Sequence, residues 1–385
     1  ILLKSKYRSE IDGLRAFAVI AVIINHFDKE ILPSGYLGVD IFFVISGFVI
    51  TSSIFGRSYD DFGNFLSSFY FRRLRRIIPA LTFFLIFTSF AVSAFCEHPS
   101  IYLKTALTAS LGISNIYLYQ TSTDYFASST ALNPFTQTWS LGIEQQFYFL
   151  FPILAWISGF SRHSKNGIKY FVLILGSLAI ASLISFIYLY EVNQAAAYFL
   201  ITSRFWEMAA GSLLFVGDRK NNKLLKSLKK IPSSLIVSLM IGTMLLPSHL
   251  ASKSTICMVT LTSILINSFQ ERTIIFKLFT KKLILFIGLI SYSLYLWHWG
   301  ILSITKWTIG ISASTIIPVA MIISLISLIS YKVFEIPLRK SNLKNRVSLV
   351  LIFLMTSISI TSSYFLGRLF IGKLYLGKNN KGESK

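Results

Sequence analysis

Three polar side chains in otherwise apolar stretches have the residue types needed for acyl transfer. His26 lies in the run Ile20–Phe27, Arg15 precedes it by eleven residues, and Glu144 lies in the run Trp139–Tyr148. A polar side chain in hydrocarbon is costly, so it is either satisfied by a neighbour or present for chemistry. An imidazole oriented by a carboxylate is the base arrangement that acyl-transfer sites use.

Arg15 and His26 are expected on one face of a single helix. Eleven residues make three helical turns within about 20°, which places the two residues about 16 Å apart along the axis. Arg15 then lies near the inner surface of a membrane, while His26 lies in the outer half at a depth similar to that of Glu144. His26, Glu144 and Arg15 are therefore candidates for a functional site, and their structural alternatives stay open at this point.

Each of these residues also has a structural interpretation. Asp12 and Arg15 are spaced i,i+3 and can form an ion pair that snorkels at the interface. A lone histidine near a helix end is commonly a satisfied structural residue. Glu144 can be solvated at the start of its helix, with Trp139 in an interfacial aromatic belt.

Four arginines cluster just before Pro79, at Arg72, Arg73, Arg75 and Arg76. Positive charges this close repel one another unless an anion compensates them. Because arginine binds phosphate in bidentate fashion, the cluster could dock a polyphosphate. Anchoring to lipid headgroups is the alternative.

Two further pairs of polar residues lie in apolar stretches. Arg204 and Glu207 are spaced i,i+3, and mutual neutralisation is favoured over catalysis for them. Tyr295 and His298 lie in "SYSLYLWHWG", where His298 is a second candidate histidine. Trp297 and Trp299 in the same stretch suit an aromatic belt.

The sequence carries no metal-ligand spacing, and its two cysteines, Cys96 and Cys257, lie at the edges of apolar runs. We therefore predict a reaction without a metal. Phosphate-binding loops of the GxxxxGK[ST] or GxGxxG type are also missing from the sequence.

The composition indicates a membrane protein. Of 385 residues, 54% are hydrophobic and 14% charged, whereas a soluble domain has roughly a quarter charged residues. The net charge of +21 comes from Lys and Arg in short loops, since 26 of the 37 fall in six segments. These are Ile1–Arg8, Arg57–Arg76, Arg162–Lys169, Arg219–Lys230, Arg272–Lys282 and Lys332–Arg346. This positive-inside pattern places the six on the cytoplasmic side and points to membrane lipids, not nucleic acid, as partners.

The apolar runs predict an all-α polytopic membrane protein with eleven transmembrane helices. Their expected bounds are 13–27, 38–55, 77–95, 139–158, 168–190, 199–217, 231–247, 254–269, 283–301, 312–332 and 347–370. An amphipathic segment precedes the third helix. A crossing at 101–119 would break the charge rule, so we predict a re-entrant segment near 101–120 that enters from the outer side and returns.

We expect three parts along the chain. Residues 1–346 form a membrane domain with the first ten helices, 347–370 form an additional transmembrane helix, and 371–385 form a polar outer tail. The first helix is read as retained, not as a cleaved signal peptide. The N-terminus is then cytoplasmic and the C-terminus outside.

Six motifs in collinear order carry a family resemblance over about residues 7–340. They are "YRSEIDGLRAFAVIAVIINHF", "GYLGVDIFFVISGFVI", "FYFRRLRRIIPAL", "TWSLGIEQQFYFLFP", "RFWEMAAG" and "SYSLYLWHW". Together they make the chain similar to the membrane acyltransferase family 3, the OafA/YrhL-like O-acyltransferases.

The resemblance implies an activity and a place in the cell. The chain is expected to transfer an acetyl or other short acyl group from cytoplasmic acetyl-CoA or another acyl-CoA. The acceptor is a hydroxyl of a lipid-linked or periplasmic glycan, such as lipopolysaccharide O-antigen, beyond the bacterial inner membrane. Many relatives carry an SGNH-type periplasmic domain after an eleventh helix; we expect that domain to be missing from this chain, or this member to work alone.

The resemblance also implies roles for particular residues. It makes Arg15 and His26 essential, and its RxxR motif fits Arg72/Arg75 or Arg73/Arg76. Glu144 matches the glutamate of its WSLxxE element. A second glutamate often follows in the family, but Gln145 stands here, so a mechanism with two adjacent carboxylates is not expected.

Under this hypothesis the arginine cluster holds the donor phosphates and the pantetheine arm passes Arg15. His26 acts as a general base or is itself acylated, and Glu144 holds its ring. Arg204, Tyr295 or His298 could stabilise the thioester oxyanion.

Two other classes of function stay open. One is a transporter or flippase whose buried charges line a solute or proton path. The other is a non-catalytic scaffold for an outer domain. Polar groups at one inner and one outer site, without inverted repeats, favour the enzyme.

Overall fold

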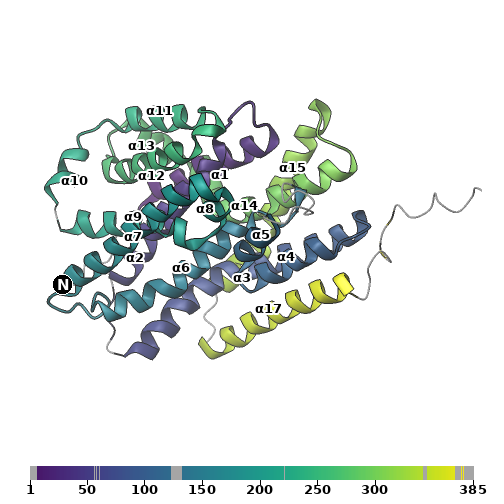
Figure 1. Ribbon diagram of the computed structural model, residues 1–385, viewed down its shortest axis with the longest axis horizontal. Helices are drawn as coiled ribbons and strands as arrows, with labels where there is room; N and C mark the ends of the chain where they lie inside the picture. Colours follow the sequence, from purple (N-terminus) through teal and green to yellow (C-terminus); the bar gives the residue numbers. More distant parts are fainter. Residues whose placement is uncertain are drawn as a thin grey trace, which may run out of the picture. The chain divides into compact units, whose positions relative to one another are not determined.

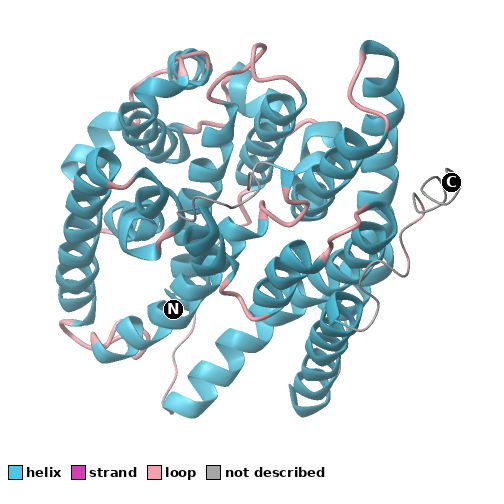
Figure 2. Cartoon of the chain, turned by 45° about the vertical axis from the view of Figure 1, so that its right-hand side comes forward, coloured by secondary structure: helices cyan, strands magenta, loops and turns pink. Residues whose placement is uncertain are grey.

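The computed structural model describes residues 7–55, 57, 59, 61–122, 132–220, 222–340, 345–368, 374 and 376. These residues are helix or loop, with no strand among them (Figure 2). The predicted all-α class is therefore confirmed. The predicted outer tail 371–385 lies outside the described residues except for Leu374 and Leu376, as do residues 1–6 of the first basic segment.

The chain divides into two compact units, the first formed by 1–66 and 144–291 and the second by 67–143 and 292–385. The boundary between them falls inside three long helices: α3 (Phe62–Phe95), α6 (Thr138–Ile157) and α14 (Lys282–Thr308). The expected division of the chain at residue 346 was drawn from transmembrane spans and stays a prediction.

The first unit holds the helices that carry most of the predicted site. Its complete helices are α1 (Ser9–Phe27), α2 (Gly38–Phe55), α7 (Gly167–Val192), α8 (Gln194–Phe199), α9 (Ile201–Arg219), α10 (Lys223–Leu228), α11 (Ser233–Met244), α12 (Ala251–Ser268) and α13 (Ile274–Phe279). Helix α2 packs against α1, α9 and α12, and α9 packs against α7 (Figure 1). The short helices α10 and α13 lie in loops predicted to be cytoplasmic.

Two glycines let α2 and α9 touch backbone to backbone. A Cβ added at Gly47 of α2 would collide with the carbonyl oxygen of Met208, and one at Gly211 of α9 would collide with that of Val44. Ser212 Oγ also donates a hydrogen bond to the Gly47 carbonyl at 3.1 Å. Small residues that allow such close approach are typical of helix pairs in membranes, where no hydrophobic force drives helices together.

We expect Gly211→Ala to destabilise the first unit, although alanine is the better helix former. The new Cβ would overlap the Val44 carbonyl oxygen, and overpacking of this kind costs about 1–3 kcal/mol. Gly242→Ala in α11 is the matched control, because a Cβ there meets nothing within 4 Å, and helix propensity alone should then favour alanine by about 1 kcal/mol. Thermal unfolding in detergent measures both, and equal behaviour of the two variants would contradict the packing argument.

The second unit contains α4 (Ser100–Ser110), α5 (Ser114–Ser122), α15 (Ala313–Ile329), a π-helical turn Ser330–Glu335, α16 (Ile336–Lys340) and α17 (Asn345–Arg368). Helix α17 runs beside α4 (Figure 1). Buried serine hydroxyls pair across the packed helices: Ser110 with Ser359 at 2.9 Å, and Ser89 of α3 with Ser363 at 3.4 Å. The additional helix predicted at 347–370 is therefore docked on this unit through polar contacts.

Eight helices of the described chain are long and apolar enough to cross a membrane. Burial separates them: 72% of the span in α2 is buried inside the protein but only 17% of the span in α7, whose apolar side chains are exposed. An exposed apolar helix of this length needs lipid around it. The chain is therefore a multi-pass membrane protein, while the predicted number of eleven spans stays a prediction, since α1, α6 and α11 are not among the eight.

Two predicted segments have a different form in the structure. The amphipathic segment and the helix predicted at 77–95 are one continuous helix, α3, which passes through Pro79. The stretch near 101–120 is broken into α4 and α5 at Gly112, which has a φ of 73°. Each piece is shorter than the roughly 20 residues of a membrane span, so re-entry of this segment stays a prediction.

Candidate functional site

The two polar residues at the end of α1 have different surroundings. Asn25 is buried, and its Nδ2 donates hydrogen bonds to the carbonyls of Leu32 and Pro33 at 2.8 and 3.0 Å. Asn25 thus holds the loop that follows α1. His26 is half-buried in the last turn of the same helix.

Arg15 lies near the other end of α1 and has the ion pair that its spacing predicts. Its Nη1 lies 3.4 Å from Asp12 Oδ1, and Tyr7 donates a hydrogen bond to the other carboxylate oxygen of Asp12. Arg15 is half-buried and Asp12 is buried. The helix therefore carries a partly neutralised positive charge about 16 Å along its axis from the imidazole.

Glu144 takes its hydrogen bonds from two hydroxyl groups of the first unit. Ser46 of α2 and Tyr148 of α6 both donate to its Oε1. Within the described residues no hydrogen bond or ion pair joins Glu144 to His26. The role of Glu144 as the residue that orients His26 stays a prediction.

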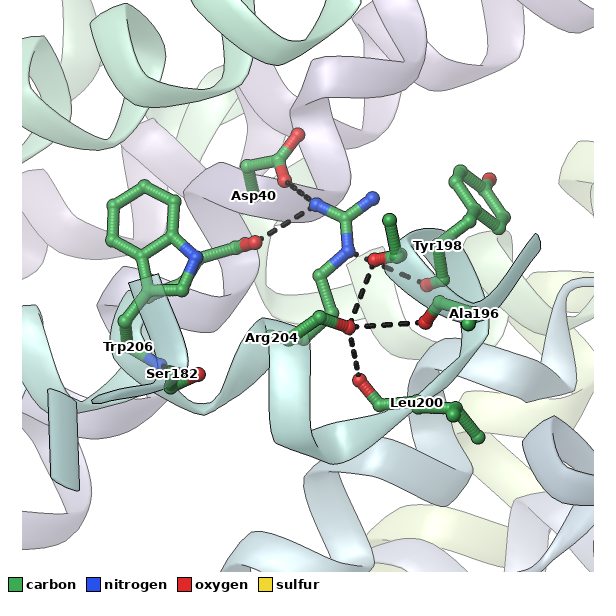
Figure 3. A network of polar contacts seen from close by, with 10 residues as sticks. Asp40, Ser182, Ala196, Tyr198, Leu200, Arg204 and Trp206 are labelled. Atoms are coloured by element: carbon green, nitrogen blue, oxygen red, sulfur yellow. Dashed lines mark hydrogen bonds and ion pairs between the residues drawn. The ribbon is translucent and has the colours of Figure 1, made fainter. Parts of the chain in front are cut away.

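Arg204 is the centre of a buried ionic network in the first unit (Figure 3). Its Nη1 lies 2.8 Å from Glu207 Oε1 and 3.0 Å from Oδ1 of Asp40, which lies in the first turn of α2. Its Nε donates to the Tyr198 carbonyl at 3.3 Å. The rings of Phe186 and Tyr198 lie 5.2 and 5.3 Å from the guanidinium carbon, which is within cation–π range.

Burial gives this network a structural role. Arg204, Asp40 and Glu207 are 5%, 4% and 0% exposed, so neither charge sign can be left alone without a large desolvation cost. The i,i+3 pairing of Arg204 with Glu207 agrees with the sequence-based interpretation. Asp40 was not among the predicted residues, although a carboxylate inside so apolar a helix is a signal that could have identified it.

The arginine cluster lies on α3 within the second unit. All four guanidinium-bearing residues are half-buried. Arg72 donates a hydrogen bond to Ser68, one turn earlier, and the guanidinium carbon of Arg75 lies 4.0 Å from the centre of the Phe71 ring. A guanidinium at this distance from an aromatic ring is within cation–π range. Donor binding by these residues stays a prediction.

Tyr295 is half-buried and His298 is buried within the second unit, and Tyr295 connects α14 to the start of α6. Tyr295 Oη donates to the Gln137 carbonyl at 3.1 Å and lies 2.8 Å from Ser140 Oγ. His298 is fully buried, and its Nδ1 lies 3.1 Å from the Leu294 carbonyl oxygen. The supporting role predicted for these two residues stays a prediction.

The expected aromatic belt at the lipid interface was wrong for three tryptophans. Trp139, Trp297 and Trp299 are 4%, 5% and 9% exposed. Trp297 packs on Phe83, and Trp299 Nε1 donates to the Asn133 carbonyl at 2.8 Å. These side chains lie in the interior of the second unit.

Another residue that was not predicted is Glu335, which closes the π-helical turn after α15 and is 1% exposed. Its Oε1 lies 3.7 Å from Arg339 Nη1, and its Oε2 accepts a hydrogen bond from Ser293 Oγ at 3.5 Å. π-Helical turns are frequent at functional sites, so this buried carboxylate deserves mutation alongside the predicted residues. No group of three or more His, Cys, Asp or Glu able to hold a metal ion occurs in the part of the chain that the structure describes.

Comparison with known proteins assigns the chain to a family. Residues 8–333 match the sequence model of the Acyltransferase domain. The chain is 32% identical over 364 residues to the protein named "Putative O-acetyltransferase SAS0844" of Staphylococcus aureus strain MSSA476, covering 89% of this chain and 59% of that protein. It is also 32% identical over 389 residues to "O-acetyltransferase OatA" of Staphylococcus aureus strain NCTC 8325, covering 94% and 64%.

The chain thus spans about three fifths of the length of these relatives. No solved structure matches it. Since the domain match extends from the start of α1 to the π-helical turn after α15, the chain belongs to the acyltransferase family that this domain defines.

Proposed function

We propose that the protein transfers an acetyl or other short acyl group from acyl-CoA to a hydroxyl of a surface glycan. The domain match over residues 8–333 carries the reaction class. The names of the two staphylococcal relatives support acetyl as the group and oxygen as the acceptor atom. The acceptor is a lipid-linked or periplasmic glycan, of which lipopolysaccharide O-antigen is one example.

The proposed location is the bacterial inner membrane, with the N-terminus cytoplasmic and the C-terminus periplasmic. The concentration of 26 of the 37 Lys and Arg in six segments supports this orientation. An SGNH-type periplasmic domain as partner stays a prediction. The donor then approaches from the cytoplasm, where acyl-CoA is made, and the acceptor from the other side.

The reaction requires a base that removes the proton of the acceptor hydroxyl. The acceptor hydroxyl loses its proton, an ester C–O bond forms, the thioester C–S bond breaks, and the released thiol carries a proton. His26 removes the hydroxyl proton as a general base, or first takes the acyl group itself. Its half-buried position at the end of α1 supports access by a substrate. Arg15, on the same helix, lies along the path of the donor arm.

The supporting residues act differently. Arg204 has two carboxylates and a carbonyl around it, which favours a structural role over oxyanion binding for Arg204 and Glu207. Asp12 partly neutralises the positive charge of Arg15 through their ion pair. Tyr295 links α14 to Gln137 and Ser140, and a supporting part for Tyr295 or His298 in the reaction stays a prediction.

A labelled-donor assay tests the function. Purified protein in liposomes receives acetyl-CoA with a radiolabelled acetyl group on one side and glycan acceptor on the other. Label covalently bound to the glycan, matched by free CoA on the donor side, is expected. Label that crosses the membrane without becoming attached to glycan would support the transporter alternative.

A paired change in the arginine cluster tests donor binding. Arg72→Gln with Arg75→Gln should weaken acyl-CoA binding by on the order of 10- to 100-fold, because each charge-assisted hydrogen bond to phosphate contributes about 1.5–3 kcal/mol. Titration calorimetry with CoA measures the change. Arg272→Gln with Lys277→Gln removes the same charge from exposed positions of another basic loop and should leave affinity unchanged. Equal CoA affinity in all three proteins would point to lipid anchoring.

A further inference from the structure

Two hydroxyl groups hold one oxygen of the Glu144 carboxyl group. Ser46 Oγ and Tyr148 Oη both donate to Oε1. The second oxygen, Oε2, has no hydrogen bond or ion pair with any described residue. Tyr148 is buried, while Ser46 and Glu144 are half-buried. The carboxyl group is thus fixed through one oxygen and presents the other.

Ser46 and Tyr148 both lie on helices that fix their positions. Tyr148 lies four residues after Glu144 and therefore on the same face of α6. Ser46 precedes Gly47, the residue through which α2 touches the backbone of α9. The backbone next to such a contact is held in place, so the Ser46 side chain starts from a fixed position. A fixed position is needed to hold a catalytic group to within a fraction of an ångström.

We infer that Ser46 and Tyr148 are positioning residues that aim Oε2 of Glu144 at the reacting groups. This inference rests on the proposed acyl transfer. Oε2 accepts a hydrogen bond from one imidazole N–H while the other ring nitrogen removes the proton of the acceptor hydroxyl. The ester C–O bond forms, the thioester C–S bond breaks, and the released thiol takes up the proton. Gln145 follows Glu144, so no adjacent carboxylate competes for the two hydroxyls.

Removing either hydroxyl group should slow the chemical step without weakening the binding of acyl-CoA. Ser46→Ala and Tyr148→Phe should each lower kcat for glycan acylation by on the order of 10-fold. A tenfold change in rate is the effect expected when one hydrogen bond to a carboxylate is lost. The double variant should fall further, and KM for acyl-CoA should stay within about twofold of wild type. Ser212→Ala is the matched control: it removes a hydroxyl at the same α2–α9 contact that donates to Gly47 and Met208 carbonyls, not to Glu144, and should leave kcat unchanged.

Two measurements separate positioning from general packing. In a Glu144→Gln background the Ser46 and Tyr148 changes should lose most of their effect, as expected for residues that act through one group. The infrared difference spectrum between wild type and Glu144→Gln isolates the Glu144 carboxyl bands, and both hydroxyl deletions should shift them.

The outcomes distinguish this inference from the function on which it rests. A wild-type protein that acylates no glycan overturns the proposed function and this inference with it. An active wild type whose two variants keep normal kcat and unshifted bands overturns the inference alone. Additive losses in the Glu144→Gln background, or a radiolabelled acyl group found on Ser46 after quenching, would also overturn it, the latter by making Ser46 a nucleophile.

Discussion

Replacing Arg204 by methionine should lower the free energy of unfolding by about 3–5 kcal/mol, the usual cost of removing one partner from a buried ion pair. Asp40 and Glu207 are 4% and 0% exposed, so the variant would leave two buried carboxylates beside each other without their cation. Such a loss is a large share of a typical stability of 5–15 kcal/mol. Thermal unfolding in detergent and the yield of monodisperse protein measure the effect.

A neutral version of the same network tests the cause. Arg204→Met combined with Asp40→Asn and Glu207→Gln removes all three charges and should recover most of the lost stability, because uncharged replacements avoid the desolvation cost. Arg219 is the control position: it lies at the exposed end of α9 and packs over Phe55 and Phe215. Arg219→Met should change the free energy of unfolding by less than about 1 kcal/mol. If the single Arg204 variant is as stable as wild type, the network is not structural.

His26→Ala should reduce acyl transfer to the glycan by on the order of 10²–10⁴-fold, the range supplied by a positioned general base. His26 is half-buried at the end of α1, and the following loop is held by the hydrogen bonds of Asn25 to Leu32 and Pro33. Folding should therefore survive, and the loss should appear in kcat. Initial rates of label transfer from acyl-CoA to glycan measure it.

The same experiment separates the two roles of His26. His249→Ala removes an exposed imidazole from a short helical turn and should be silent. Acyl label found on His26 when wild type is quenched without acceptor would make it a covalent carrier, and its absence would favour the base. A His26→Ala protein with a normal rate would end the catalytic assignment.

Local features of this fold could be predicted from the sequence because they depend on neighbours in the chain. The run 38–55 gave the bounds of α2, and the spacings Asp12/Arg15 and Arg204/Glu207 gave their ion pairs. Hydropathy and helical periodicity contain this information directly. They do not contain partners that lie far away along the chain.

The missed features depend on such distant partners. Asp40 joins Arg204 across 164 residues, and Ser46 reaches Glu144 across 98. Trp297 and Trp299 resemble interfacial aromatics until the rings and carbonyls that bury them are known. The amphipathic segment and the helix predicted at 77–95 were treated as separate because they differ in polarity, whereas α3 contains both.

The close backbone approach of α2 and α9 at Gly47 and Gly211 has a mechanical consequence. With no side-chain layer between them, α2 and α9 cannot slide by one residue without a clash between a carbonyl oxygen of one helix and the other helix. The Asp40–Arg204 ion pair also resists rotation of one helix against the other. Helices α2 and α9 therefore behave as one rigid body. Any motion during a catalytic cycle must carry both helices together, so Ser46 keeps a constant distance from the α9 backbone throughout.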